Sequence, residues 1–346
     1  MSHLVEQIAE LTAFRDRDAL DFSLATALQD LLRPQAVLVH RLVGEPGAQH
    51  WLLRARVGGD EDEPAADSLW AELDSLPALQ AMPHHAHCLQ GGRIVALEGA
   101  DGTPALTLFA LAAEHEALGV LELRSERPLA ADAQRLVCAV LRIYRNFQGL
   151  LDYSERDTLT GLLNRKTFDE CFARAVRHPR ADPGRAVAPE PRRVVRDTRA
   201  CLGLVDVDHF KRVNDSLGHL IGDEVLLLLS RLMRSTFRYH DRLFRFGGEE
   251  FVVLMRCGSV ADARSALERL REAVERHVFP RIGHITISVG LTLLRPDDTP
   301  SAAFERADKA VYFAKHNGRN QLCDHDALVA GGLLADETRA SDVELF

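Results

Sequence analysis

Two glycines followed by two carboxylates, Gly247-Gly248-Glu249-Glu250, lie between two apolar runs of the chain. The runs, Leu243 to Phe246 and Phe251 to Met255, have strand length, and a Gly-Gly pair between such runs predicts a β-hairpin with a tight turn. Glycine tolerates positive φ and carries no side chain, so a ligand can approach this backbone closely. Carboxylates on a rigid turn are suitable ligands for a hard divalent cation such as Mg²⁺, which works together with phosphates. The alternative is a solvated acidic hairpin.

A second group of polar residues follows a predicted buried strand at 201–207. Asp206 lies near the end of this strand, where α/β folds place their ligands, and Asp208 can cap the short helix that follows. On that helix Lys211 and Asn214 are three residues apart and share a face. One of them can hold a phosphate while the other reads the edge of a base. The alternative is an ordinary capped helix with surface charges.

Several strings of the second half resemble, in order, the motifs of the GGDEF family of diguanylate cyclases. They are DTLTGLLNR at 157–165, DVDHFKRVND at 206–215, GHLIGDEVL at 218–226, GGEEF at 247–251, SVG at 288–290 and the stretch 307–320. The resemblance covers Asp157 to Asn320 and implies a mixed sheet wrapped by helices, like that of class III nucleotide cyclases.

This resemblance implies that two GTP molecules condense to cyclic di-GMP and two pyrophosphates between the half-sites of a homodimer. The implied cofactor is Mg²⁺, or alternatively Mn²⁺, held by Asp206, the carbonyl of Val207 and Glu249. Glu249, or else Glu250, would take the proton of the attacking hydroxyl. The other implied substrate contacts are Lys211, Lys315 and Arg319 at phosphate, and Asn214, His219, Asp223, Gly247 and Gly248 around the nucleoside.

The resemblance also implies a second nucleotide site ahead of the hairpin. Arg238 and Asp241 resemble the RxxD site that binds the product, with Arg269 as a further contact. An Arg fork beside a carboxylate can grip a phosphate and a guanine edge together. This arrangement predicts feedback inhibition by cyclic di-GMP, and a local salt bridge is the alternative. Members of the family with damaged motifs act only as nucleotide receptors, but the motifs of this chain are whole.

The first half, 1–129, alternates between helical and strand-like patterns. Apolar residues recur at helical spacing over 4–32, and strand-like runs follow at 36–43, 51–57, 93–97, 106–111 and 118–123. This order predicts an α+β domain with an antiparallel sheet. The string GVLELRSERPL at 119–129, followed by Asp132 and an apolar helix, resembles the end of a GAF-type sensory domain. A PAS-like domain and a dimerisation scaffold without a ligand are the alternatives, and the signal is unknown.

A long helix at 130–156 is predicted to connect the two domains. One apolar stripe has coiled-coil spacing and consists of Leu136, Val140, Ile143, Phe147 and Leu150. A second stripe beside it consists of Val137, Leu141, Tyr144 and Leu151. Two stripes predict one face for the sensory domain and one for a partner subunit in a signalling and dimerisation helix. The alternative is a single wide face buried within one domain.

Three further segments are predicted to be irregular. The string HHAHC at 84–88 contains metal-ligand residue types, but consecutive residues rarely converge on one ion, so a polar loop is favoured. The Pro- and Arg-rich stretch 178–199 predicts a surface loop inside the cyclase domain at 157–324. Residues 325–346 are acidic and weakly patterned, which predicts a tail.

Composition sets outer limits on the function. The chain has 346 residues, enough for two domains, and a net charge of −9, which argues against a nucleic-acid partner. Its six cysteines show no CxxC or metal-ligand spacing, as expected in a reducing compartment. No apolar run approaches the ~20 residues of a membrane helix. The sequence therefore predicts a cytoplasmic protein without a membrane span.

Overall fold

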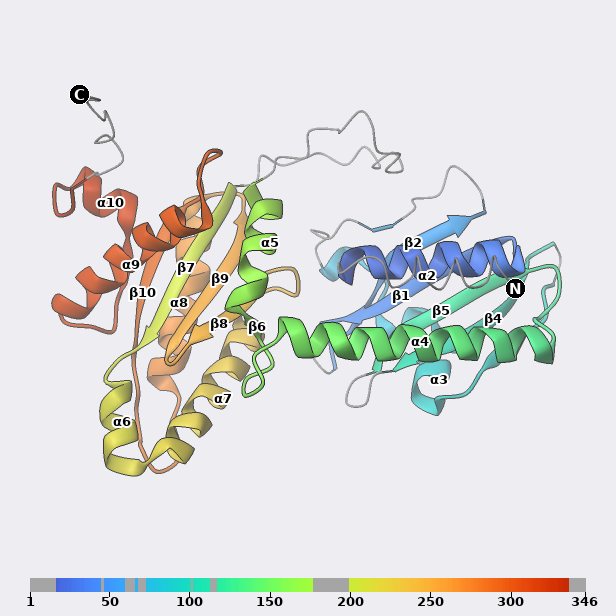
Figure 1. The fold of residues 1–346 in the computed structure, drawn as a ribbon, viewed down its shortest axis with the longest axis horizontal. Helices are drawn as coiled ribbons and strands as arrows, with labels where there is room; N and C mark the ends of the chain where they lie inside the picture. Colours follow the sequence, from blue (N-terminus) through green and yellow to red (C-terminus); the bar gives the residue numbers. More distant parts are fainter. Residues whose placement is uncertain are drawn as a thin grey trace, which may run out of the picture. The chain divides into compact units, whose positions relative to one another are not determined.

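The computed structural model describes residues 17–44, 47–59, 66–67, 73–100, 102–112, 117–176 and 199–335. The chain divides into two compact units (Figure 1). The first consists mainly of the residues up to Ser154, and the second mainly of those from Glu155 onward. Each unit has its own sheet and its own hydrophobic core.

The first unit contains a five-stranded sheet in the order β2-β1-β5-β4-β3, with all pairings antiparallel. Its strands are β1 (Ala36–Val43), β2 (His50–Gly58), β3 (Val95–Leu97), β4 (Ala105–Ala112) and β5 (Ala117–Ser125). These strands confirm the predicted runs and the predicted antiparallel sheet. The helix expected over 4–32 is seen as α2 (Arg17–Leu32), and the residues before it lie outside the described ranges.

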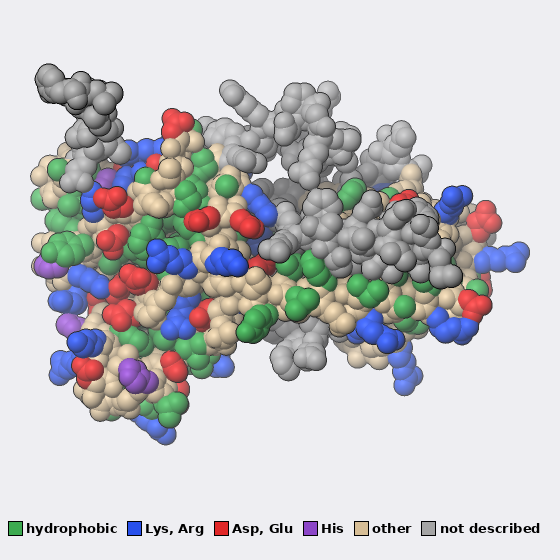
Figure 2. All heavy atoms as spheres, viewed as in Figure 1, with side chains coloured by type: hydrophobic (Ala, Val, Ile, Leu, Met, Phe, Trp, Pro, Cys, Tyr) green, Lys and Arg blue, Asp and Glu red, His purple; other side chains and the backbone are tan. Residues whose placement is uncertain are grey.

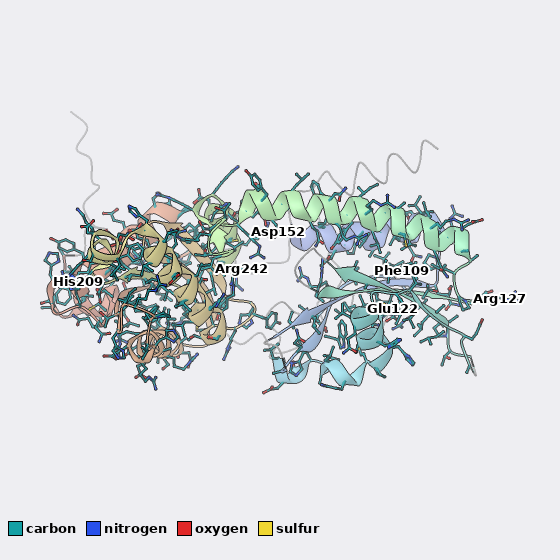
Figure 3. The ribbon with its side chains drawn as sticks, turned by 90° about the horizontal axis from the view of Figure 1, so that it is seen from below. Phe109, Glu122, Arg127, Asp152, His209 and Arg242 are labelled. Carbon is teal, nitrogen blue, oxygen red and sulfur yellow. The ribbon has the colours of Figure 1, made fainter. Side chains whose placement is uncertain are left out.

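The two faces of this sheet are covered differently. Helices α2 and α4 (Ala131–Glu155) pack on one face, where Val39, Phe109 and Leu121 form part of the core. Helix α3 (Pro83–Gly91) covers the other face over a smaller cluster that includes Trp51 and Cys88. Figure 3 shows Phe109 and Glu122 on opposite sides of the sheet. Two short 3₁₀ helices, η1 (Leu73–Ser75) and η2 (Leu79–Ala81), precede α3.

The prediction of a polar loop at 84–88 is wrong. These residues form most of α3, and within it His85 and Cys88 are buried while His84 and His87 are exposed. Pro83 at the first helical turn and Gly92 in a left-handed conformation after the last one mark the limits of the helix. The buried positions are three residues apart, which is the spacing of one helix face.

A buried polar network joins three elements of the first unit. Arg41 on β1 donates from Nη2 to Asp21 Oδ1 at 2.7 Å and from Nε to Asp21 Oδ2 at 3.1 Å. Tyr144 on α4 donates its hydroxyl hydrogen to Asp21 and accepts a hydrogen bond from Arg41. Burial alone would raise the pKa of Asp21, but Arg41 and these hydrogen bonds hold it below its ordinary value. The network therefore fixes α2 and α4 to the sheet through an ionised carboxylate.

Helix α4 buries more of its surface within the first unit than a two-stripe arrangement requires. The second predicted stripe is buried, and Val140, Ile143 and Phe147 of the first stripe also contact the core. A single wide face thus describes most of the helix. Only towards its C-terminal end do large apolar side chains remain exposed, namely Leu150 at 67% and Tyr153 at 81%.

The second unit contains a six-stranded mixed sheet in the order β11-β10-β7-β9-β8-β6. The strands are β6 (Leu163–Asn164), β7 (Arg199–Val207), β8 (Arg242–Gly247), β9 (Glu250–Cys257), β10 (Ile287–Leu293) and β11 (Leu322–Asp324). The two outer pairings, β6 with β8 and β10 with β11, are parallel, and the inner ones are antiparallel. The mixed sheet and the β8–β9 hairpin confirm the expectations from the sequence.

Helices cover both faces of this sheet. One face packs against α7 (His219–Thr236) and α8 (Val260–Arg276), and the other against α5 (Arg165–Val176) and α9 (Pro300–His316). Thr299 caps α9, because its side chain accepts a hydrogen bond from the Ala302 N–H. Helix α6 (Phe210–Leu217) packs against α7, and α10 (His325–Ala330) packs against α9. The tail expected from residue 325 therefore begins with a helix, in which His325 and Leu328 are buried.

Most of the predicted surface loop at 178–199 lies outside the described residues, as does 336–346. All six cysteines are free thiols. Among the helices that the structure describes, none combines the length and the apolarity needed to cross a bilayer. On the face shown in Figure 2, acidic and basic side chains are interspersed over the second unit.

Candidate active site

The predicted catalytic carboxylates lie at one end of the central strands of the second sheet. Asp206 on β7 is the register partner of Glu250 on β9, and the Val207 N–H donates to the Glu249 carbonyl at 3.4 Å. Asp206 lies near the end of the apolar strand β7, and Glu250 begins the apolar strand β9. Pairing of the two buried strands therefore brings these carboxylates together. The structure thus unites two motifs that are more than forty residues apart in the chain.

The turn before Glu249 requires its two glycines. Gly247 has φ of +151° and Gly248 has φ of +53°, conformations that L side chains rarely adopt. An ideal Cβ built on either glycine meets no atom within 4 Å among the described residues. The constraint is therefore conformational, and the backbone of the turn is open to a ligand, as the sequence predicts.

The charges at this end of the sheet repel one another. Burial raises the pKa of Asp206, Glu249 and Glu250, and the charge of Asp206 raises the pKa of both glutamates further. Lys315 opposes this effect, because its Nζ lies 2.7 Å from Asp206 Oδ1. The site therefore has three carboxylates and one ammonium group, and a cation bound here would reduce the repulsion among the carboxylates.

The donor set fits a hard divalent cation. Asp206 is 7% exposed, and the partner of its buried Oδ1 is the Lys315 ammonium group, whose Nζ lies 2.7 Å away. Carboxylate and carbonyl oxygens are the ligands that Mg²⁺ prefers. Asp206, Val207 and Glu249 offer such oxygens at neighbouring positions.

Asp208 has a different role from the helix cap that the sequence suggested. The residue before α6 is His209, which has φ of +59° and makes no side-chain cap. The Asp208 carboxylate instead accepts hydrogen bonds from Thr286 Oγ1 and Ser288 Oγ, both at 2.7 Å, and from the Asn320 N–H at 3.0 Å. This carboxylate is 4% exposed and joins β7 to β10 and to the loop after α9. Its partners are remote in sequence, so no local pattern reveals them.

The predicted nucleoside contacts lie on two helices that pack together. Lys211 and Asn214 are on α6, and His219 and Asp223 are on α7. Helix α7 begins at His219. A Cβ on Gly222 would lie 2.0 Å from Asn214 Oδ1, so the glycine allows the Asn214 side chain to lie directly against α7.

The two predicted phosphate contacts after α9 differ in their surroundings. Lys315 lies in the last turn of α9 and reaches the carboxylate of Asp206. Arg319 is exposed, has φ of +61°, and is held by its N–H, which donates to the Ala314 carbonyl at 2.9 Å. The structure thus brings Lys315 into the carboxylate cluster and leaves the guanidinium of Arg319 at the surface.

Comparison with known proteins assigns this half of the chain. Residues 154–321 match the family described as "Diguanylate cyclase, GGDEF domain". The C-terminal half is a GGDEF domain. The assignment agrees with the resemblance that the sequence motifs carry, and it leaves the antiparallel-sheet unit at the N-terminus without a family.

Two curated relatives align over the GGDEF domain. Diguanylate cyclase DgcP of Pseudomonas aeruginosa is 40% identical over 169 residues, covering 48% of this chain and 23% of that protein. Diguanylate cyclase DgcZ of Escherichia coli is 35% identical over 171 residues, covering 49% of this chain and 52% of that protein. The chain thus spans about a quarter and about half of the length of these two relatives.

Among solved structures, the GGDEF domain of DgcB from Caulobacter crescentus in complex with c-di-GMP is 31% identical, with a TM-score of 0.43. The match covers 50% of this chain and 96% of that one.

Two of the three predicted product-binding residues of the GGDEF domain, Arg238 and Asp241, lie in the turn between α7 and β8. The Arg238 N–H donates to Asp241 Oδ2 at 3.0 Å. Burial raises the pKa of Asp241 to about 6, against the opposing charges of Arg238 and Arg269. The structure therefore places the charge of Arg269, on α8, near the other two residues, as the sequence predicts.

One residue of the GGDEF domain that the sequence did not single out is Arg245, on β8. Its Nε and Nη2 donate to the Gly248 carbonyl at 3.3 and 3.0 Å, and so fix the turn that precedes Glu249. Its place within the hairpin, two residues before Gly247, is the one signal that points to such a role.

Proposed function

We propose that this chain is a diguanylate cyclase, which converts two GTP molecules into cyclic di-GMP and two pyrophosphates. The observation that supports it most is the pairing of Asp206 with Glu250 across β7 and β9, with Lys315 on Asp206, inside a GGDEF domain whose motifs are whole. Carboxylates and an ammonium group at the end of paired strands suit a reaction on a metal-bound nucleotide.

In each of two condensation steps, the 3′-hydroxyl oxygen of one GTP forms a bond to the α-phosphorus of the other. The bond from that phosphorus to the bridging oxygen breaks, and pyrophosphate leaves with the electron pair. The hydroxyl proton passes to Glu249, or else to Glu250. Before a metal ion binds, burial and the charge of Asp206 raise the pKa of both glutamates.

Mg²⁺, or Mn²⁺, held by Asp206, the Val207 carbonyl and Glu249, would lower the pKa of the 3′-hydroxyl and neutralise charge on the α-phosphate. Lys315 would then exchange its carboxylate partner for a phosphate oxygen. Lys211 and Arg319, both exposed, would add positive charge along the triphosphate.

The nucleoside would lie against α6 and α7. Asn214 and Asp223 would hydrogen-bond the guanine edge, and His219 and the backbone of Gly247 and Gly248 would line the remaining contacts. A carboxylate accepts from both the N1–H and the exocyclic amine of guanine, and adenine has no such pair of donors. This chemistry favours GTP over ATP.

One active centre of this kind requires two chains, because each GGDEF domain supplies one half-site. A homodimer is therefore part of the proposal, with exposed Leu150 and Tyr153 of α4 as candidate contacts to the partner subunit.

We further propose that the first unit is a GAF-like sensory domain in the cytoplasm. Its central antiparallel sheet with a long C-terminal helix supports that assignment. Arg238, Asp241 and Arg269 would bind cyclic di-GMP and inhibit the enzyme.

The deciding experiment incubates the full chain, stripped of bound nucleotide, with GTP and Mg²⁺ and separates the products by chromatography. We expect cyclic di-GMP and pyrophosphate in a 1:2 ratio, no product from ATP, and none from Asp206→Asn. GTP binding without turnover, at several protein concentrations, would instead show a nucleotide receptor.

A further inference from the structure

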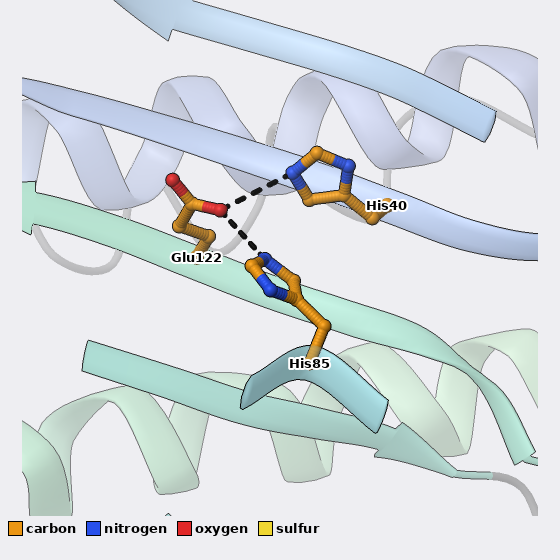
Figure 4. Close-up of side chains that lie close together, drawn as sticks. All are labelled: His40, His85 and Glu122. Carbon is orange, nitrogen blue, oxygen red and sulfur yellow. Dashed lines mark hydrogen bonds and ion pairs between the residues drawn. The ribbon is translucent and has the colours of Figure 1, made fainter. Parts of the chain in front are cut away.

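Three metal-ligand side chains converge inside the first unit, far from the GGDEF domain in sequence. His40 comes from β1, Glu122 from β5 and His85 from α3 (Figure 4). His85 Nε2 lies 2.7 Å from Glu122 Oε2, and His40 Nε2 lies 3.3 Å from the same oxygen. One donor atom from each residue lies within 4.8 Å of the others. We call this group the His-His-Glu cluster.

The sheet register explains why these residues meet. Glu122 is the register partner of Leu38, and His40 is the partner of Val120, so His40 and Glu122 are diagonal neighbours on one face. Helix α3 crosses that same face and presents His85 to it, next to Trp51 at a ring distance of 5.8 Å. The elements that hold the cluster are regular and paired, so its geometry is fixed by the fold.

The cluster is buried and incompletely hydrogen-bonded. The exposed fractions are 8% for His40, 5% for His85 and 2% for Glu122. His40 Nε2 faces the carboxylate at 3.3 Å, which is an ion-pair contact without the geometry of a well-formed hydrogen bond. A buried imidazole nitrogen whose only contact is long and poorly aligned gains stability when an ion binds it.

We propose that His40, His85 and Glu122 bind a divalent first-row transition-metal ion, of the kind exemplified by Zn²⁺ and Fe²⁺. Two imidazoles and one carboxylate are the protein ligands of many zinc and non-haem iron sites, whereas Mg²⁺ prefers oxygen alone. At metal–ligand bonds of ~2.0–2.1 Å, neighbouring ligands of a tetrahedral ion lie roughly 3.3 Å apart. The observed 2.7 and 3.3 Å to Glu122 are close to this spacing, and all three donor atoms lie within 4.8 Å of one another.

A neighbouring contact orients the carboxylate for this role. Arg124 Nε donates to Glu122 Oε1 at 2.6 Å, so Oε2 is the oxygen that faces the two imidazoles. Such outer hydrogen bonds commonly fix the ligands of a metal site. The charge of Arg124 lowers the affinity for every cation, and the two imidazole ligands are the reason that we expect a transition metal to bind without competition from Ca²⁺ or Mg²⁺.

The competing explanation is an ion pair between Glu122 and protonated histidines, with no metal. The test uses the full chain, freed of metal with a chelator and then dialysed against Zn²⁺ with excess Mg²⁺. The excess Mg²⁺ fills the oxygen-ligand site of the GGDEF domain. We expect about one Zn²⁺ per chain by mass spectrometry, and at least ~10²-fold weaker binding in His40→Gln and in His85→Gln.

Helix α3 supplies matched controls, because His84 and His87 are exposed on the same helix. His84→Gln and His87→Gln should bind as much Zn²⁺ as the unaltered chain. Equal binding by His85→Gln, or no binding by the unaltered chain, would overturn the proposal.

A second measurement does not depend on the folding of any variant. X-ray absorption of the Zn²⁺-loaded chain should show two imidazoles and further oxygen or nitrogen ligands. A sulfur ligand, or a shell of oxygen alone, would contradict the assignment. Neither measurement uses cyclase activity as its readout.

Discussion

Arg245 donates hydrogen bonds from Nη1 to both carboxylate oxygens of Asp157, at 3.0 and 3.2 Å, across 88 residues of sequence. Asp157 also accepts hydrogen bonds from the N–H of Thr160 at 2.8 Å and from its hydroxyl at 2.7 Å. The same guanidinium holds the Gly248 carbonyl. One side chain thus joins the first turn of the GGDEF domain, directly after α4, to the turn that carries Glu249.

Replacement of this arginine tests the link. Arg245→Lys keeps the charge but loses the fork, because one ammonium cannot reach Asp157 and the Gly248 carbonyl together. We expect kcat to fall roughly 10- to 100-fold through displacement of Glu249, with a smaller change in KM for GTP. Steady-state kinetics measure both values. Arg276→Lys, in an exposed helix pair with Glu272, is the control, and an unchanged kcat in Arg245→Lys would show that the link has no catalytic role.

Removal of the carboxylates tests the proposed metal ligands. Asp206→Asn and Glu249→Gln should each lower the rate of cyclic di-GMP formation by at least ~10³-fold, because each removes a negative ligand without changing the side-chain shape. Initial rates at saturating GTP and Mg²⁺ provide the measurement, and Glu272→Gln, at an exposed position of α8, is the control. Substantial residual activity in either variant would refute the metal assignment.

The pH dependence of stability tests the burial of Asp241. Its folded pKa of about 6 lies above the ordinary 3.8, so the folded domain holds a proton that the unfolded chain releases first. The protonated Asp241 side chain therefore favours folding below about pH 4. This contribution to the free energy of unfolding is lost as the pH rises through 6. Asp241→Asn removes this loss and should stabilise the domain at pH 7 by about 1–3 kcal/mol.

Urea unfolding near pH 5 and near pH 7.5 checks this expectation, with exposed Asp297→Asn as the control. The stabilisation by Asp241→Asn should be larger at the higher pH. An equal effect at both values would mean that Asp241 is ionised throughout.

Feedback inhibition depends in our proposal on Arg238. Arg238→Ala should raise the cyclic di-GMP concentration that half-inhibits the enzyme at least ~10-fold, because it removes a charge-assisted contact to phosphate. The measurement is the initial rate against added cyclic di-GMP. Arg231→Ala, an exposed arginine on α7, is the matched control, and equal inhibition of both variants would place the product elsewhere.

The buried network of the first unit predicts a large stability effect. Asp21→Asn leaves the Arg41 charge without its carboxylate and should destabilise this unit by about 3–5 kcal/mol. Both tryptophans, Trp51 and Trp70, precede Ser154, so fluorescence during urea unfolding follows this unit alone. Asp30→Asn, exposed on the same helix, should leave the transition in place.

Much of both sheets is predictable because strands are local signals. The runs at 36–43 and 201–207 are apolar, have strand length, and appear where expected. The glycine turn and the carboxylates beside it were also identifiable, because chain reversal needs a particular backbone and a metal needs oxygen ligands.

Other features depend on contacts between remote segments and therefore escape a reading of local patterns. His85 is one polar residue among several until the register of β1 and β5 places His40 and Glu122 under it. The burial of Ile143 and Phe147 depends on how α4 rotates on its sheet, which two apolar stripes do not specify.

The hydrogen bond from the Asn320 N–H to Asp208 has a consequence for synthesis. It spans 112 residues of sequence. The outer edge of β10 is likewise unpaired until β11, at Leu322–Asp324, has been synthesised. At ~5–20 residues per second, a ribosome needs roughly 6–20 s to extend the chain from Asp208 to Asn320. During that interval the strand that carries Asp206 is made but its support is not. A nascent chain would therefore be silent, and second-messenger production could begin only after the last strand of the domain is released.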